Sequence, residues 1–169
     1  MKENMKKIEE TMRLSIFEVF EKMFYIFLEP LNDESDEYDM DAAIRFKGSM
    51  SGEIRILLSM DIVKTMIQNM LGLKEDKITT QRMEDCSKEA VNVICGNFLG
   101  KLNSSKVFNL LPTVFGEGSD EKSRDSGLSE NICRMDFDSD GGRVGIVATL
   151  SDQIGRVVDC SATNRPLAP

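Results

Sequence analysis

The chain has 169 residues, of which 41% are hydrophobic and 30% are charged, and its formal net charge at pH 7 is −8. This length and composition suit one globular domain with a real core. The acidic balance argues against binding to nucleic acid or to an anionic membrane surface, because phosphate recognition needs clustered Lys and Arg. No apolar run approaches a bilayer span and no export signal is apparent, so we expect a cytoplasmic protein without membrane insertion.

The reactive residue types also limit the chemistry. Histidine is absent, and the four cysteines have no metal-ligand spacing. These features argue against His-based acid–base catalysis, Ser-His or Cys-His nucleophile pairs and nearly all zinc sites. We expect reduced thiols, and any chemistry must use carboxylates, amides, hydroxyls or a metal that a partner brings.

The first part of the chain predicts a long helix and a hairpin. Apolar residues recur every three or four positions over residues 3–28, which is typical of an amphipathic helix, and Pro30 should end it. The acidic segment 31–41 should be a solvated loop, because like charges bury poorly. Hydrophobic residues alternate over 42–47 and 53–58, which predicts the two strands of a β-hairpin.

Two helices are expected next. Ser59 or Asp61 can cap the start of a short helix, and Gly72 can close it. A second long helix is predicted over residues 79–102, a stretch that contains no proline.

The last part of the chain predicts three strands. One is expected over residues 107–111, and residues 131–138 and 143–151 should form a second hairpin. The stretch 117–130 is rich in Ser, Asp, Glu and Gly and should be an exposed loop.

The order of elements predicts the fold class. It reads helix, two strands, two helices and three strands, and the strands come in hairpins rather than alternating with helices. We therefore expect one α+β domain over residues 1–151, with two long helices and one short helix on a mainly antiparallel sheet. Residues 152–169 should form a partly disordered tail.

The second long helix carries one polar stripe on an otherwise apolar surface. Its members fall three or four positions apart and therefore share one line of the helix: Asp85, Glu89, Asn92 and Gly96. One interpretation is a solvated face with an incidental small residue. The other is that Glu89 is a positioned acceptor and that Asn92 orients a water molecule, since an amide both accepts and donates hydrogen bonds. Such orientation is worth about 100-fold or more in rate.

The stripe resembles the signature of the CheC/CheX/FliY chemotaxis phosphatases. In that family an Asp or Ser, three residues, a Glu, two residues and an Asn lie on a long helix, with a Gly soon after and a Pro downstream. The matching residues are Asp85, Glu89 and Asn92, followed by Gly96-Asn97 and by Leu111-Pro112-Thr113-Val114. The element order is similar too, so the resemblance covers about residues 5–151 and implies a CheC/CheX-like fold.

The resemblance implies an activity and a role for each residue. The family accelerates hydrolysis of the phosphoryl-aspartate on CheY or a similar receiver domain. Asn92 would align water with the acyl phosphate, and Glu89 would engage the active-site lysine of the receiver. Asp85 and Gly96 would support them, as a polar neighbour and as clearance for the partner. Mg²⁺ would belong to the receiver, so the chain would need no cofactor of its own.

Two departures from the family pattern refine the resemblance. Some relatives carry a second site on the first helix, but here the stretch from Ser15 has Glu21 where an Asn is required, and a carboxylate repels a phosphoryl group. We therefore predict a single site. The separation of Asn92 and Pro112 is shorter than the CheC spacing, which favours a CheX-like member and hence a homodimer. The alternative function is a non-catalytic adaptor that binds a receiver domain or a signalling or flagellar-switch complex.

Overall fold

The structure of the chain is a computed structural model. It describes residues 2–32, 37–103, 105–116 and 131–152. The loop expected over 117–130 and the tail beyond residue 152 lie outside the described residues.

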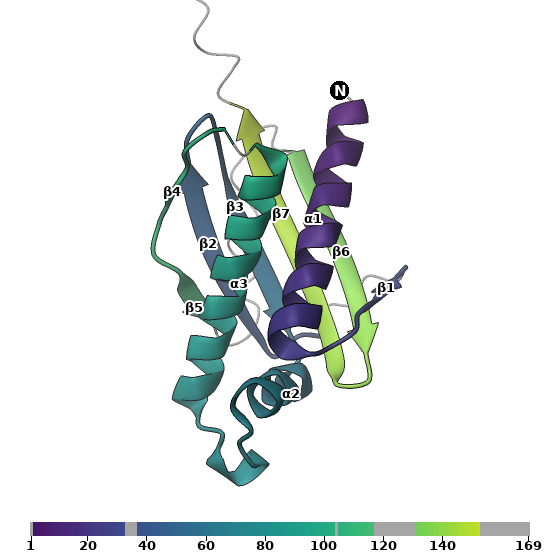
Figure 1. Ribbon diagram of the computed structural model, residues 1–169, viewed down its shortest axis with the longest axis vertical. Coiled ribbons are helices and arrows are strands. Elements are labelled where there is room, and N and C mark those ends of the chain that lie inside the picture. Colours follow the sequence, from purple (N-terminus) through teal and green to yellow (C-terminus); the bar gives the residue numbers. More distant parts are fainter. Residues whose placement is uncertain (1, 33–36, 104, 117–130, 153–169) are drawn as a thin grey trace, which may run out of the picture.

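Two long helices cover one face of the sheet. α1 (Lys2–Phe24) and α3 (Thr80–Leu102) lie side by side on that face, and α2 (Met60–Leu71) lies below its lower end (Figure 1). A turn of 3-10 helix, η1 (Glu75–Lys77), links α2 to α3. Among the described residues, no helix is both long and apolar enough to cross a bilayer.

The strands form one antiparallel sheet in the described part of the chain. They are β1 (Glu29–Leu31), β2 (Met40–Lys47), β3 (Met50–Leu58), β4 (Asn109–Leu110), β5 (Val114–Gly116), β6 (Asn131–Ser139) and β7 (Gly142–Asp152). Their order across the sheet is β1-β6-β7-β3-β2-β4, and β5 also pairs with β2. The two predicted hairpins, β2–β3 and β6–β7, are therefore present and are joined by the pairing of β3 with β7.

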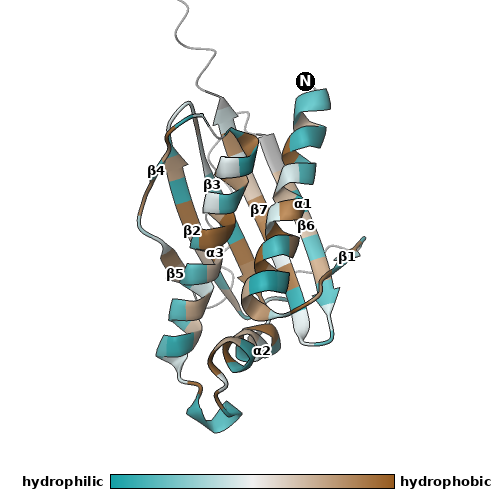
Figure 2. Cartoon of the chain, viewed as in Figure 1, coloured by the Kyte–Doolittle hydropathy of each residue, from teal (hydrophilic) through white to brown (hydrophobic). Residues whose placement is uncertain are grey.

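The core lies between the sheet and the two long helices. Alternate residues of β3 are buried, including Ile54 and Ile56, because every second side chain of a strand points to the same face. The helices contribute large apolar side chains, among them Phe20 of α1 and Ile94 and Phe98 of α3. Figure 2 shows hydrophobic and hydrophilic residues alternating along both helices, as helices that cover a core require.

The α+β class and the mainly antiparallel sheet are confirmed, but some predicted bounds are wrong. A short edge strand that was not predicted, β1, leads into the acidic segment and pairs with β6. Pro30 lies inside this strand, and an edge position accepts it because its missing N–H is not needed. The strand predicted over 107–111 is present only as the two residues of β4, and a second short strand that was not predicted, β5, follows after residues 111–113.

The first helix ends four residues earlier than predicted, at Phe24. Tyr25 adopts a left-handed backbone conformation with φ of 56°, and the amide of Ile26 donates to the carbonyl of Phe20 at 2.9 Å. The side-chain amide of Asn69 in α2 donates to the carbonyl of Phe24, also at 2.9 Å. These bonds satisfy carbonyl groups that a helix end leaves open. Phe27, one of the apolar residues within the helix predicted over 3–28, is consequently 74% exposed.

Candidate functional site

The polar stripe is held on a well-anchored helix. The hydroxyl of Thr79 caps α3 by accepting from the amide of Arg82 at 3.2 Å, as expected for a helix that starts at this pair of threonines. On the opposite side, Ala90, Val91 and Ile94 are fully buried against the core. A helix packed in this way keeps its exposed side chains in fixed relative positions.

The structure brings Glu89 and Asn92 together with their polar groups unengaged. Glu89 is exposed and Asn92 is half-buried. Neither side chain makes a hydrogen bond or an ion pair with another residue that the structure describes. Asp85 is exposed as well, and its carboxylate accepts a bond of 2.9 Å from the side-chain amide of Gln81. The carboxylate of Glu89 and the amide of Asn92 are thus available to a partner.

An open groove lies beside the stripe. It has a volume of about 590 Å³ and is lined by Asp85, Lys88, Glu89 and Asn92 of α3 and by Leu110, Leu111, Pro112 and Thr113. The second wall is fastened to the sheet, because the amide of Leu111 donates to the carbonyl of Arg45 in β2 at 2.9 Å. The proline segment matched by the family resemblance therefore faces the Glu89–Asn92 pair.

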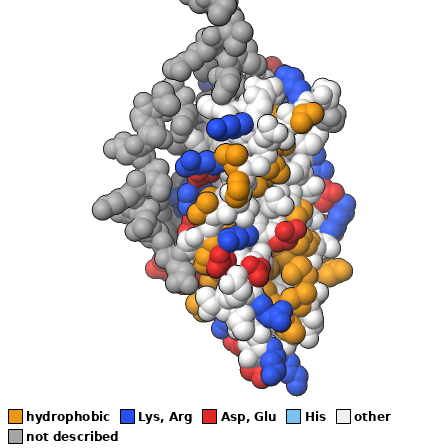
Figure 3. All heavy atoms as spheres, turned by 90° about the vertical axis from the view of Figure 1, so that its left-hand side faces the viewer, with side chains coloured by type: hydrophobic (Ala, Val, Ile, Leu, Met, Phe, Trp, Pro, Cys, Tyr) orange, Lys and Arg blue, Asp and Glu red, His pale blue; other side chains and the backbone are white. Residues whose placement is uncertain are grey.

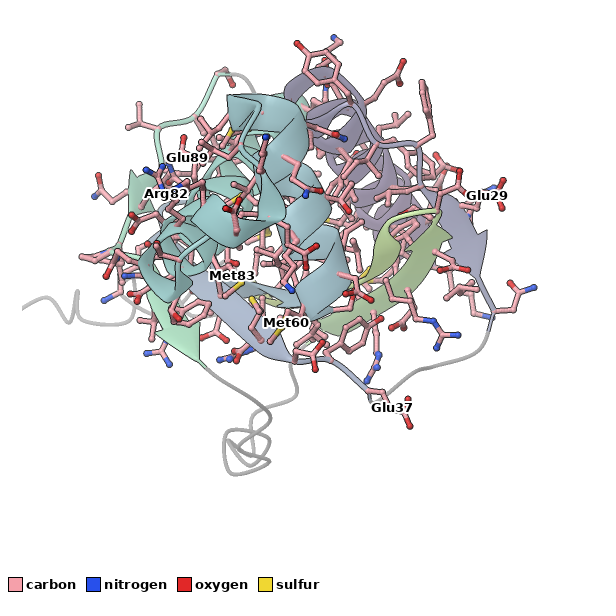
Figure 4. All side chains as sticks on the ribbon, turned by 90° about the horizontal axis from the view of Figure 1, so that it is seen from below. Glu29, Glu37, Met60, Arg82, Met83 and Glu89 are labelled. Atoms are coloured by element: carbon pink, nitrogen blue, oxygen red, sulfur yellow. The ribbon has the colours of Figure 1, made fainter. Side chains whose placement is uncertain are left out.

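The surface around the groove is mixed in character. Figure 3 shows the side of the molecule on which β4 and β5 lie in Figure 1, where acidic and basic side chains alternate between hydrophobic patches. From below, Glu89 and Arg82 lie on the same side of α3 (Figure 4). Leu110 and Val114 add exposed apolar area beside the groove, at 42% and 67% exposure. Such a face suits a macromolecular surface better than a small molecule, which needs an enclosed pocket.

Gly96 lies in open space. A Cβ atom built on it would meet no atom within 4 Å, and the residue is exposed. Packing within the chain therefore does not require a glycine at this position.

The stretch of α1 expected to lack a second site is engaged within the chain. Ser15 is fully buried, and its hydroxyl donates to the carbonyl of Thr11 at 2.8 Å. Glu18 accepts from Lys22 at 2.7 Å and from Lys101 at 2.6 Å. Hydrogen bonds and charge from Lys101 and Lys22 lower the pKa of Glu18 to about 2. Unlike Glu89, this carboxylate already has partners.

Two residues of the groove, Lys88 and Leu110, were not singled out from the sequence. Lys88 lines it, and its Nζ lies 2.6 Å from Oε1 of Glu84. The only signal in the sequence is its position four residues before Asn92, which places the two on the same face of a helix. The other wall of the groove could not be located from spacing, because it comes from a different part of the chain.

None of the cysteines in the described part of the chain lines the groove. Burial raises the pKa of the Cys86 thiol to about 12, and the charge of Glu89 adds to the shift. Cys95 and Cys133 are likewise free and buried. No group of three or more His, Cys, Asp or Glu in the described residues could hold a metal ion.

The fold and the groove together define a class of protein. It is an α+β domain that carries a carboxylate and an amide on one well-packed helix, beside an open groove. Residues 40–135, more than half of the chain, match the family model described as chemotaxis phosphatase CheX. The chain belongs to this CheX family.

Solved structures show the same fold at low sequence identity. The CheX protein of Desulfovibrio desulfuricans is 18% identical with a TM-score of 0.70, and the match covers 86% of this chain and 99% of that one. CheX of Vibrio vulnificus is 19% identical with a TM-score of 0.69, covering 85% and 96%. CheX in a CheX-CheY-BeF3-Mg²⁺ complex from Borrelia burgdorferi is 18% identical with a TM-score of 0.65, covering 83% and 96%. A comparison with curated protein sequences gave no match.

Proposed function

We propose that this protein is a cytoplasmic phosphatase that accelerates hydrolysis of the aspartyl-phosphate of a CheY-like response regulator. One observation carries the proposal: Glu89 and Asn92 lie on one side of an anchored helix, beside an open groove, with polar groups that no described residue engages. Family membership supports it, and the relative from Borrelia burgdorferi forms a complex with CheY.

In this proposal Asn92 acts on the attacking water. Its carbonyl oxygen accepts a hydrogen bond from the water and its NH₂ group donates to an oxygen of the acyl phosphate, which holds the water in line with phosphorus. The water oxygen bonds to phosphorus as the bond to the aspartyl oxygen breaks. Inorganic phosphate leaves and the aspartate carboxylate is restored, so no covalent intermediate forms on this chain.

Glu89 fixes the docking geometry in the same proposal. Its exposed carboxylate forms an ion pair with the active-site lysine of the receiver, which sets Asn92 at the correct depth. Mg²⁺ is bound by the receiver, and the relative's complex with CheY contains this ion. Asp85 and Gly96 are supporting residues, and the single site lies on α3.

The test is phosphate release from a phosphorylated CheY receiver. Asn92→Ala should slow the stimulated rate by about 100-fold or more, the value expected for a positioned water. Asn97→Ala is the matched control, because Asn97 is an amide on the same helix that does not line the groove. It should retain the native rate. Equal rates for Asn92→Ala and the native chain would rule out the proposed role of Asn92.

The second candidate function is a non-catalytic adaptor for a receiver domain or for a signalling or flagellar-switch complex. The net charge of −8 favours it, because an acidic surface can hold a lysine-bearing partner without turnover. If the protein is an adaptor, the native chain would bind the receiver without changing the rate at which the receiver loses its phosphoryl group. Glu89→Ala would weaken that binding. We also propose a homodimer, which sedimentation equilibrium would measure directly.

A further inference from the structure

The groove contains one basic side chain that the proposed mechanism does not use. Among the residues that line it, Lys88 is the single cation, whereas Asp85 and Glu89 are anionic. An acyl phosphate brings two further negative charges to the same place. Without Lys88, the negative charges of the groove would repel the phosphoryl group that it is proposed to bind.

The position of Lys88 relative to Asn92 gives it a specific target. Residues four apart on a helix are neighbours, so Lys88 lies directly beside Asn92, one turn nearer the start of α3. Glu89, three residues before Asn92, flanks it on the other side. A phosphoryl group that meets Asn92 therefore comes within reach of the lysine side chain.

We propose that Lys88 is a phosphoryl-binding residue that exchanges Glu84 for the phosphoryl group when a phosphorylated receiver docks. This inference rests on the proposed function and adds to it a residue that selects the phosphorylated form of the partner. In the free protein the ammonium pairs with Glu84 at 2.6 Å. In the complex it donates to a phosphoryl oxygen beside the amide of Asn92.

The exchange is favoured by the nature of the two partners. The side chains of Lys88 and Glu84 are 32% and 30% exposed, and ion pairs one turn apart on an exposed helix face contribute little to stability. A phosphoryl group carries more charge than a carboxylate, and docking removes water that screens the contact. Lysine suits this role, because its ammonium is a compact charge on a flexible four-carbon stem.

The direct test compares binding to a CheY receiver with and without beryllofluoride and Mg²⁺, since beryllofluoride imitates the phosphoryl group. Lys88→Met should reduce the preference for the loaded receiver about tenfold, the loss expected for one charge-assisted hydrogen bond. Lys101→Met is the control for net charge, because it removes the same charge near the far end of the same helix. It should leave the preference unchanged.

A second comparison tests the exchange with Glu84. Glu84→Gln frees the lysine and should increase the preference for the loaded receiver, but it should have no effect when Lys88→Met is already present. Equal effects of Glu84→Gln in both backgrounds would show that Glu84 does not act through Lys88.

The outcomes separate this inference from the proposed function. If the native chain binds the loaded receiver preferentially but does not accelerate phosphate release, the phosphatase proposal fails while the role of Lys88 is still measured. If Lys88→Met weakens binding to loaded and unloaded receivers equally, or changes neither, the proposed contact with the phosphoryl group is wrong. In a turnover assay, loss of the contact should raise KM about tenfold with kcat within about twofold, because the charge is present before and during the reaction.

Discussion

Replacement of Gly96 by alanine should raise the stability of this protein and lower its activity toward the receiver. The added methyl group would meet no atom within 4 Å, and the residue lies inside α3 with no unusual backbone angle. Alanine in a helix interior is about 1 kcal/mol more favourable than glycine. For a domain of this size, the gain corresponds to a rise in Tm of about 2–4 °C.

The same methyl group should impair docking if Gly96 provides clearance for a receiver. Overpacking of a close contact costs about 1–3 kcal/mol, so KM for the phosphorylated receiver should rise about 5- to 150-fold. Thermal unfolding and a phosphate-release assay on the same preparation measure both effects. We expect a variant that is more stable than the native chain and less effective against the receiver.

Gly100 supplies the matched control. A Cβ atom there also meets nothing within 4 Å, and Gly100 lies one turn further from the groove. Gly100→Ala should be stabilised to a similar extent with little change in KM. A Gly96→Ala protein with native KM would refute the role of Gly96 in clearance, and loss of stability would refute the inference that its surroundings are open.

Two further predictions concern the scaffold. Tyr25 has φ of 56°, a left-handed conformation that glycine adopts more readily than alanine. In urea unfolding, Tyr25→Gly should therefore be about 1 kcal/mol more stable than Tyr25→Ala, which is the reverse of the order in a helix interior. Equal stabilities would show that the left-handed conformation is not strained. The pKa of Glu18 is lowered to about 2, chiefly by Lys101, so its contribution is present above the unfolded value near 4.5 and is lost as the pH falls toward 2. Glu18→Gln should therefore lose less stability than the native chain between pH 4.5 and 2 in acid titrations of the unfolding free energy, and parallel curves would contradict this.

The second long helix shows how much of a site can be predicted from spacing. Apolar residues on most of its circumference must be buried, so the stripe that contains Glu89 and Asn92 must be exposed. The cap at Thr79 fixes where the helix begins and therefore which turn each residue occupies. These are local properties, and the structure agrees with them.

The parts that could not be predicted depend on distant pairing or on backbone conformation. The wall opposite Asn92 forms because residues 110–113 return to the edge of β2, and no local pattern encodes that approach. Tyr25 ends α1 in a conformation that usually indicates glycine, so its residue type predicts continuation rather than an end. The place of Lys88 in the groove is likewise visible only once that wall is known.

The pairing of β3 with β7 affects the order in which the parts of the fold around the groove can assemble. These strands lie at the middle of the sheet, and their register joins Met50 to Asp152 and Leu58 to Val144, which are 102 and 86 residues apart in the chain. A growing polypeptide therefore completes β2, β3 and the α3 helix that packs on them well before β7 can pair with β3. Such distant pairings slow folding, because the intervening loop must close first. A fragment limited to residues 40–135 would carry every side chain of the groove, but it would lack β7, which joins β6 to β3, and α1, which packs against α3.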